Sequence, residues 1–574
     1  MKRRNFLKKL PIAISIPFSI GGIPMKLMAD NPLVRLASQS NSDRVLIVLQ
    51  LAGGNDGLNS LIPVDQYDQY YSRRPNIAIP AKNGVRKYIP LDSTLPLASQ
   101  VGLHPDMLAM KAMYDQGRMA FVQGVSYKNN NGSHFRGRDI WFMGGGSDDY
   151  FSSGWLGRYL QYEYSPQLYP QDFPNSNMQD PLALELGNQV SLIFHQRDNI
   201  PTSISIANPG QFFGLVNGLE GFGDLVDDRG FPPDFLKDSP YWKELDWILK
   251  LEDKSKSYAQ RLQEVWAASS EPKITYTTKY PFNAPDGSKN NPLSEQLMTI
   301  ARLLGGGCKT RVFMIQIGGF DTHADQVENY DPTMGAHAAL MYHISTAMRD
   351  FQDDLRARGI EDRVLTVTTS EFGRRIPSNG SFGTDHGTGG PIFIFGKGVQ
   401  PGVVGNVPDL TKDNVDLQFD YRQVYANLLQ DWMLAKKDAI SNIFAKEDKA
   451  GNVDQPRNFI DGIVDGVQYS PLPLANNVIA GTNGFIESRF ALQDCFPNPA
   501  KNKTTMIFRV NGNNNVTINL MDNQGRHIKT LVNKTYDPGE YREEVDLNGL
   551  TSGTYLYQMK TVFYNETKKL VIAK

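Results

Sequence analysis

Short continuous apolar runs recur along the chain, and each ends in a turn that contains glycine or an acidic residue. The predicted buried strands are residues 44–51 (RVLIVLQL), 119–123, 311–317 (RVFMIQI), 363–369 (RVLTVTT) and 391–395 (PIFIF). Apolar runs without alternation are typical of a parallel sheet covered on both faces.

Segments with helical spacing separate these strands. In residues 335–358, for example, Leu340, Ile344 and Met348 fall on one face. The other predicted helices cover residues 104–117, a stretch that begins near His134, and residues 240–268, 293–305 and 420–435. Repeated alternation of strands and helices predicts an α/β fold with a mostly parallel sheet flanked by helices.

Changes of texture divide the chain into regions. We assign residues 40–450 to the α/β domain, with residues 200–290, rich in Gly, Pro and aromatic residues, as an insertion or lid. Residues 451–489 are predicted to be a linker. Residues 490–574 contain short alternating strands separated by Asn, Gly and Asp turns, which predicts a small all-β sandwich.

The N-terminus predicts export. Residues 1–29 combine a basic start (KRRNFLKK) with a short apolar stretch, which is typical of a signal peptide. Paired arginines followed by Phe-Leu-Lys indicate the twin-arginine route; the alternative is an ordinary secretory signal that contains two arginines. No later run has the length and apolar character of a membrane span.

Composition adds two exclusions. A formal net charge of -2 over 574 residues gives no reason to expect nucleic-acid binding. The two cysteines, Cys308 and Cys495, fall in different predicted domains, so a disulfide between them is not expected.

Acidic residues and histidines gather where the predicted strands end. Asp321 and His323 follow one strand, Glu371 follows the next, and Asp385 and His386 form a Gly-rich turn before residues 391–395. Loops at the carboxyl ends of parallel strands are where ligands bind in such sheets. Carboxylates and imidazoles together indicate a site for Mg²⁺, Mn²⁺ or Zn²⁺. The alternative is that these acidic residues cap turns and helices.

A second group of candidates lies near residue 133. Ser133 precedes a predicted helix, where the helix dipole and free amides suit a nucleophile, although a simple capping serine is an equal alternative. His134 is adjacent to it and is a second catalytic candidate. Arg136, Arg138 and Arg374 are candidates to hold an anionic group.

Taken in order, several stretches resemble the domain of unknown function 1501 family, whose members are often exported by the twin-arginine route. The matching stretches are LQLAGGNDGLN, LHPDM, GSHFRGRDIW, GWLGRYL, GGFDTHADQ, TSEFGRR, GTDHGTGGP and YRQVYANLLQDW, over residues 40–440. The family is similar to the alkaline phosphatase and sulfatase superfamily, which implies a metal-dependent site.

The resemblance implies roles for individual residues. Asp56 resembles the first metal ligand of the superfamily and Ser133 its nucleophile. Metal ligands are implied at Asp321, His323, Glu371 and His386, with Asp385 as a further candidate. An oxygen-rich set of this kind favours Mg²⁺ or Mn²⁺.

The sequence also departs from the superfamily. The Asp321 pair is spaced Asp-x-His rather than Asp-x-x-x-His, and Phe372 follows Glu371 where an imidazole is expected. No Cys/Ser-x-Pro-x-Arg element lies near residue 133, which argues against a formylglycine sulfatase.

The C-terminal region resembles the sorting domain of the type IX secretion system of Bacteroidota. The resemblance depends on FPNP at residues 496–499, the Gly525 turn, GTY at 553–555 and the terminal KKLV. It implies passage across the outer membrane to the cell surface or medium. The alternative is a generic ligand-binding sandwich.

These features together predict an exported, cell-surface, metal-dependent hydrolase-like protein that acts on a phosphate or sulfate ester. The expected partners are an anionic ester or glycan and the two export machineries. One alternative is a non-catalytic surface protein that binds a glycan, lipid or protein through a degenerate metal cleft. Another is an isomerase or transferase of phosphorylated sugars.

Overall fold

The computed structural model describes residues 19–20, 23–24, 43–81, 86–187, 190–206, 257–447, 453–476, 491–493, 495–510, 514–522, 525–536, 539–561 and 565–573. Most of the predicted signal peptide and the part of the predicted insertion from residue 207 to residue 256 lie outside the described residues. Within the predicted helix at 240–268, residues 257–268 are helical.

A nine-stranded sheet forms the centre of the α/β domain in the described residues. Its order is β13-β7-β12-β11-β3-β10-β8-β9, with β14 paired to β7. The strands are β3 (Val45–Leu51), β7 (Met119–Ser126), β8 (Ala183–Glu185), β9 (Ser203–Ser205), β10 (Val312–Ile317), β11 (Val364–Thr369), β12 (Gly390–Phe395), β13 (Gly402–Val404) and β14 (Phe419–Asp420). The predicted mostly parallel α/β sheet is thereby confirmed, since only the pairings of β12, with β11 and with β7, are antiparallel.

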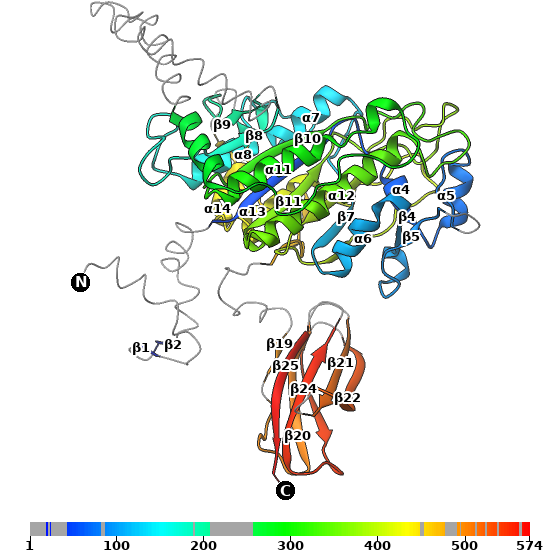
Figure 1. Ribbon diagram of the computed structural model, residues 1–574, viewed down its shortest axis with the longest axis vertical. Helices are drawn as coiled ribbons and strands as arrows, with labels where there is room; N and C mark the ends of the chain where they lie inside the picture. Colours follow the sequence, from blue (N-terminus) through cyan, green and yellow to red (C-terminus); the bar gives the residue numbers. More distant parts are fainter. Residues whose placement is uncertain are drawn as a thin grey trace, which may run out of the picture.

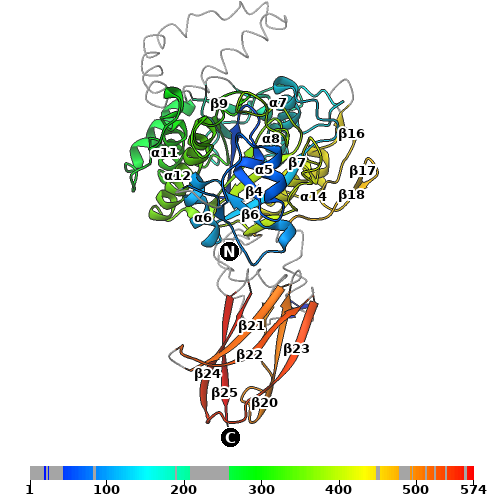
Figure 2. The ribbon, with the colours of Figure 1, turned by 90° about the vertical axis from the view of Figure 1, so that its right-hand side faces the viewer.

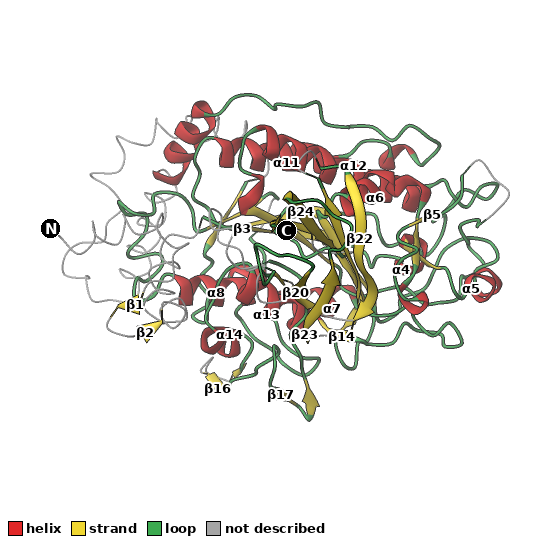
Figure 3. Ribbon diagram, turned by 90° about the horizontal axis from the view of Figure 1, so that it is seen from below, coloured by secondary structure: helices red, strands yellow, loops and turns green. Residues whose placement is uncertain are grey.

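Helices cover both faces of this sheet, as Figures 1 and 3 show. On one face lie α6 (Leu108–Asp115), α11 (Pro292–Gly305) and α12 (Ala336–Ala357). On the other lie α7 (His134–Met143), α8 (Trp155–Glu163), α13 (Tyr421–Asp431) and α14 (Lys437–Ile443).

The unbroken apolar sequence of β3 follows from this double cover. Val45, Ile47 and Leu49 belong to the hydrophobic cluster on the α11 and α12 face, whereas Leu46 and Val48 belong to the cluster on the α7 and α13 face. Successive side chains of a strand point to opposite faces, so a strand with two covered faces needs apolar residues at every position.

The direction of β12 determines which loops meet. Because β12 is antiparallel to β11 and to β7, its amino end lies at the edge of the sheet where β3, β7, β10 and β11 have their carboxyl ends. The turn before β12 therefore joins the turns after those four strands. The candidate residues selected from the sequence lie in these five turns, except His134, Arg136 and Arg138, which lie in α7 directly after the turn that follows β7.

Smaller elements complete the domain. They are α4 (Gly57–Ser60), α5 (Tyr67–Arg73), a small sheet of β4 (Leu61–Pro63), β6 (Val101–Leu103) and β5 (Ile89–Pro90), and two hairpins, β15 (Lys446–Glu447) with β16 (Val453–Gln455) and β17 (Ile463–Val464) with β18 (Val467–Gln468). Within the described part of the chain, no helix has both the length and the apolar character needed to cross a bilayer.

The predicted linker at 451–489 is wrong for the part that the structure describes. Phe459, Ile460 and Leu474 are buried in the hydrophobic cluster that includes α13 and α14. Residues 453–476 are therefore part of the α/β domain. The sequence did not indicate this packing, because the segment contains few apolar residues and is otherwise irregular.

The C-terminal region is the predicted all-β sandwich, seen in Figure 2. One sheet has the order β19-β20-β23 and the other β22-β21-β24-β25. The strands are β19 (Ala491–Leu492), β20 (Lys503–Val510), β21 (Asn514–Met521), β22 (His527–Tyr536), β23 (Gly539–Asp546), β24 (Gly553–Lys560) and β25 (Asn565–Ile572). This region has its own core, which includes Phe508, Ile518 and Tyr557. Cys495 in this core and Cys308 in the α/β domain are both free thiols, as expected.

Candidate metal centre

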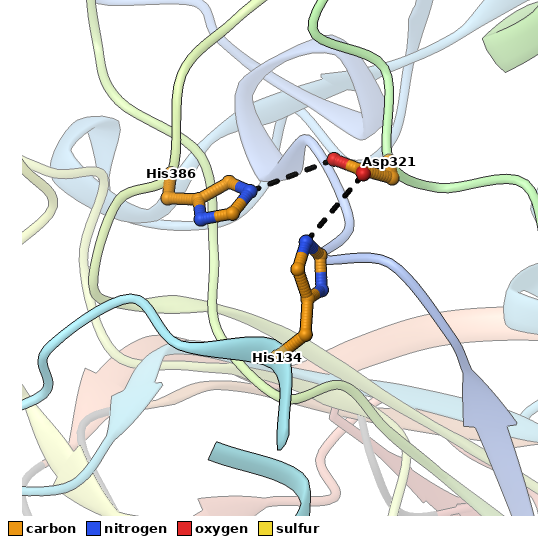
Figure 4. Close-up of side chains that lie close together, drawn as sticks. All are labelled: His134, Asp321 and His386. Carbon is orange, nitrogen blue, oxygen red and sulfur yellow. Dashed lines mark ion pairs between the residues drawn. The ribbon is translucent and has the colours of Figure 1, made fainter. Parts of the chain in front are cut away.

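Three side chains from distant parts of the sequence meet at the carboxyl edge of the sheet (Figure 4). His134 is the first residue of α7, Asp321 follows β10, and His386 precedes β12. Nε2 of His134 lies 3.5 Å from Oδ2 of Asp321, and Nε2 of His386 lies 3.5 Å from Oδ1 of the same carboxylate.

Each imidazole uses its other nitrogen for an oxygen acceptor. Nδ1 of His386 lies 2.7 Å from the carbonyl oxygen of Gly132, and Nδ1 of His134 lies 3.0 Å from Oε1 of Glu371. These contacts assign the proton to Nδ1 in both rings and leave the Nε2 lone pairs directed at Asp321. Both Nε2 atoms are buried and lack a hydrogen-bond partner among the described residues.

This arrangement fits a divalent metal ion. Two ligand atoms of a tetrahedral zinc site stand about 3.3–3.4 Å apart when the metal–nitrogen bonds are about 2.0–2.1 Å. The two separations of 3.5 Å come close to that value and are long for hydrogen bonds. Buried polar atoms normally have partners, so the two unpaired nitrogens favour a ligand at this point.

Glu371 lies behind His134 and not beside Asp321. Its Oε1 accepts a hydrogen bond from the backbone amide of Gly53 at 2.8 Å in addition to the contact with His134. This carboxylate–histidine arrangement is the one that orients metal-binding imidazoles in proteins. The geometry therefore favours Glu371 as a positioning residue over the predicted role of metal ligand.

Arg374 holds Asp321 from behind. Its Nη2 donates to Oδ1 of Asp321 at 2.7 Å, and its other donors reach the backbone carbonyls of Gly54 and Thr384. The side chain is completely buried. The prediction that Arg374 contacts a substrate anion is therefore corrected, because this guanidinium faces the protein interior.

Asp56 is also removed from the cluster. Its carboxylate is fully buried, and Nη1 of Arg74 lies 2.8 and 2.7 Å from its two oxygens. It also accepts from Gln326 and caps α4 through the amide of Leu58. A carboxylate held in this way is part of the structural support, which corrects its predicted role as the first metal ligand.

His323 and Asp385 flank the cluster on a more exposed side. Nε2 of His323 lies 3.4 Å from Oδ1 of Asp321, and its Nδ1 lies 3.6 Å from Asp385. About half of each side chain is exposed. Asn379 donates to Oδ1 of Asp385 and to the backbone carbonyl of His323, so the two segments are connected.

Ser133 is the capping residue of α7. Its Oγ accepts a hydrogen bond from the amide of Arg136 at 3.3 Å, as the capping alternative predicted. The hydroxyl proton remains free of any described acceptor. Ser133 lies between Gly132, which holds His386, and His134 itself.

The charges of the cluster suit a cation. Burial raises the pKa of Asp321, but the hydrogen bond and charge of Arg374 outweigh it, so the pKa lies below its usual value. Burial lowers the pKa of His386, and the hydrogen bond to Gly132 opposes this only in part. An ionised carboxylate and a neutral imidazole are the protonation states that bind metals.

A cavity of about 700 Å³ opens beside His134 and Glu371. Its lining includes Gln50 on β3, Gln316 on β10 and Arg138 on α7. Of the three arginines considered from the sequence, Arg138 faces this cavity, whereas Arg136 donates to the backbone of Ser147 and Asp149.

Two contributors were not evident from the sequence. His134 was predicted to be catalytic, whereas the geometry favours it as a source of a ligand nitrogen, and Gly53 was not predicted at all. The position of His134 could have indicated a ligand role, because His134 lies in the segment after the end of β7, as Asp321 lies after the end of β10. The role of Gly53 depends on a backbone contact that no side-chain pattern records.

Comparison with known proteins supports both predicted resemblances. Residues 246–461 match the family described as "Protein of unknown function (DUF1501)", and residues 494–573 match the "Secretion system C-terminal sorting domain". The first region contains Asp321 and His386. The C-terminal sandwich is thus similar to sorting domains of this kind, and this similarity points to export. No curated protein matches the chain in sequence.

Solved structures offer only distant likeness. The PsFucS1 sulfatase from Pseudoalteromonas sp. is 12% identical, with 90% of this chain and 86% of that chain covered and a TM-score of 0.30. The alkaline phosphatase from the Antarctic bacterium TAB5 is 12% identical, with 63% of this chain and 95% of that chain covered and a TM-score of 0.23. The phosphonate monoester hydrolase SpPMH from Silicibacter pomeroyi is 12% identical, with 89% of this chain and 90% of that chain covered and a TM-score of 0.24.

Proposed function

We propose that this protein is an exported, cell-surface, metal-dependent hydrolase that acts on a phosphate or sulfate ester. The observation that carries the proposal is the pair of unpartnered Nε2 atoms, on His134 and His386, directed at one carboxylate. A purely structural metal site has a closed set of four protein ligands. A site with three protein ligands leaves one coordination position open for water or substrate.

His134, Asp321 and His386 would hold the ion, with His323 and Asp385 next to them. A divalent ion in this place would polarise an ester oxygen and help to generate a nucleophile. Because Asp56 and Glu371 are engaged elsewhere, the ligand set is richer in nitrogen than the sequence suggested. Imidazole ligands favour Zn²⁺ and other first-row transition metals over Mg²⁺.

The remaining residues prepare the reaction. Glu371 and the Gly132 carbonyl orient the two imidazoles, and Arg374 keeps Asp321 ionised. Ser133 is our candidate nucleophile, since its oxygen lies at the amino end of α7, where the dipole favours negative charge. Arg138, which lines the cavity, takes the anion-orienting role first given to Arg374.

Export completes the proposal. The sorting domain points to a cell-surface or secreted location, and we propose that the twin-arginine route carries the chain across the inner membrane. That route moves folded proteins, so a metal ion could be bound before export.

Metal analysis combined with hydrolysis assays tests the function. We expect the purified full chain to contain about one divalent ion per molecule and to hydrolyse aryl phosphates or aryl sulfates. The Ser133→Ala variant should keep the metal and lose hydrolysis. A full chain that folds, takes up no added Zn²⁺ or Mn²⁺ and hydrolyses no ester would falsify the proposal.

One observation favours a second candidate, a non-catalytic surface protein that binds a ligand through the same cleft. Arg374 and Asp56, which the resemblance placed in the reaction, are buried in internal contacts. Metal at full occupancy without hydrolysis of any ester in a broad panel would select this candidate.

A further inference from the structure

The cavity beside the metal centre interrupts the cover of the sheet. β10 lies in the interior of the sheet between β3 and β8, and it is buried at every position except Gln316. A strand with helices on both faces is expected to be buried throughout. The exposure of Gln316 therefore marks a place where the protein leaves the sheet open on one face.

Gln316 has a partner of the same chemistry. Gln50 of β3 is its register partner in the parallel pair, so both side chains lie on the same face. That face is the one on which Val48 and Met314 pack, toward α7. Neither side-chain amide makes a hydrogen bond within the described residues, and both line the cavity.

Two further groups line the cavity: an unpaired carboxylate oxygen and an exposed aromatic ring, with the guanidinium of Arg138 5.9 Å from the ring centroid. Oε2 of Glu371 is buried and accepts no hydrogen bond from the described residues, although Glu371 as a whole is only 5% exposed. A buried carboxylate oxygen of this kind requires a donor. At the cavity rim, Phe135 in the first turn of α7 is 75% exposed, which is unusual for an aromatic side chain.

We propose that this cavity binds one or more sugar units of a saccharide, so that the ester cleaved at the metal centre is carried on a glycan. The amides of Gln50 and Gln316 and the free oxygen of Glu371 would bind hydroxyl groups, and Phe135 would pack on a sugar face. The position of the ester rests on the proposed function, whereas saccharide binding does not.

The chemistry of the lining favours a saccharide over a nucleobase. A glutamine amide both donates and accepts, and so does a hydroxyl group, while the Glu371 oxygen needs a donor that each hydroxyl supplies. A flat base would need apolar surface on both faces, and Phe135 is the one exposed aromatic side chain among the residues lining the cavity. The lining also mixes Arg138 with Glu185 and Asp139, so it lacks the excess of positive charge that a polyanion requires.

The test measures binding rather than turnover. The full chain, stripped of metal, is applied to a broad array of natural glycans and, separately, titrated with nucleosides. The best-bound saccharide is then titrated into Gln316→Ala and Phe135→Ala. The control is Tyr71→Ala, which removes an aromatic side chain that is 53% exposed on α5, away from the cavity.

We expect saccharide binding that weakens about tenfold or more in each cavity variant and is unchanged in Tyr71→Ala. Phe135→Ala removes only a surface side chain, so it remains informative if Gln316→Ala does not fold. Absence of saccharide binding, binding of nucleosides alone, or equal affinity in the cavity variants would each overturn the inference. Saccharide binding without metal uptake would support the saccharide inference and refute the proposed hydrolase. Hydrolysis of aryl esters without saccharide binding would support the hydrolase and refute the saccharide inference.

Discussion

Glu371 and the carbonyl of Gly132 perform the same task for two different imidazoles. Each accepts the Nδ1 proton and thereby directs a lone pair on Nε2 toward Asp321. The two acceptors differ in charge and in origin, one being a side chain and the other the backbone. Only the side-chain acceptor can be removed by substitution. The orientation of His134 can therefore be tested by mutagenesis, whereas that of His386 cannot be tested in this way.

Replacement of Glu371 by alanine should weaken metal binding by about 10- to 100-fold, because His134 loses its orienting partner. Competition with a chromophoric chelator measures the affinity. Glu295→Ala, which removes an exposed carboxylate on α11, is the control and should leave the affinity unchanged. If Glu371→Ala binds metal as tightly as the unchanged protein, Glu371 does not orient His134.

Asp56 makes a prediction about stability and pH. Burial raises the pKa of its carboxyl, but the charges and hydrogen bonds of Arg74 and other neighbours outweigh this effect, and the pKa is lowered in the folded state. The ion pair therefore stabilises the protein above the unfolded-state pKa, about 4, and this contribution is lost as the pH falls through and below that value.

Asp56→Asn should accordingly lower the free energy of unfolding at pH 7 by about 3–5 kcal/mol, since it leaves the Arg74 charge buried and unpaired. Chemical denaturation at pH 7 and at successively lower pH measures the difference between variant and unchanged protein. The difference should be constant from pH 7 to about pH 5 and shrink below about pH 4. A difference that grows on acidification contradicts the assignment.

At the scale of elements, the turn that follows β3 supports both sides of the candidate metal centre. The amide of Gly53 donates to Glu371, and its carbonyl accepts from Arg374. Gly53 has a φ of 121°, and a Cβ at this position would stand 2.3 Å from the backbone nitrogen of Asp321. Only glycine fits here, for conformational and for steric reasons.

Gly53→Ala should therefore displace the Asp321 turn and reduce both metal content and stability. Gly307→Ala is a matched control, because Gly307 also has a positive φ, 90°, but a Cβ at that position would meet no atom within 4 Å beyond its chain neighbours. The two variants share the conformational cost, and their difference reports the steric clash alone. Metal content by elemental analysis and thermal unfolding are the measurements; equal losses in both variants would exclude the clash as the cause.

The elements themselves could be predicted well. Residues 363–369 and 311–317 were expected as strands and are β11 (Val364–Thr369) and β10 (Val312–Ile317). A strand covered on both faces has an uninterrupted apolar sequence, and that is a local signal. The antiparallel direction of β12 left no such signal, because direction depends on how distant strands pair.

The site was predictable to a similar extent. The sequence placed Asp321 and Glu371 at the correct edge of the sheet, because both follow a strand end that is visible in the pattern. His386 reaches the same edge only because β12 is antiparallel to its neighbours, which the pattern did not predict. The sequence did not reveal that Glu371 contacts the imidazole of His134 or that Arg74 forms an ion pair with Asp56. The partners in a buried contact can lie anywhere in the chain. Isolated apolar anchors such as Phe459 were missed for the same reason.

At the scale of the whole molecule, the C-terminal sandwich and the candidate metal centre should be separable. The sandwich has its own hydrophobic core, and the metal centre is built entirely from the α/β domain. Removal of residues 491–574 should abolish delivery to the cell surface without changing metal content. Cell fractionation and elemental analysis of the shortened chain check both points. A shortened chain that folds but cannot bind metal would show that the sandwich contributes to the site.

Metal removal should destabilise the folded protein. A ligand present at about 100 times its dissociation constant contributes about 2.7 kcal/mol to the free energy of unfolding. Chelation should therefore lower the melting temperature of the unchanged protein, and it should have no effect on a His134→Ala/His386→Ala double variant. A chelator effect that persists in the double variant would place the stabilising ion elsewhere.

The three candidate ligands, His134, Asp321 and His386, are separated by about 190 and about 65 positions in the chain. The complete set of three side chains is therefore assembled only once distant strands have joined the sheet, and we expect uptake of an ion to come late in folding. Bound metal is in this sense a mark of a finished domain. If the protein is exported and binds an ion as proposed, an ion that slows reopening of those last contacts would also extend its resistance to proteases outside the cell.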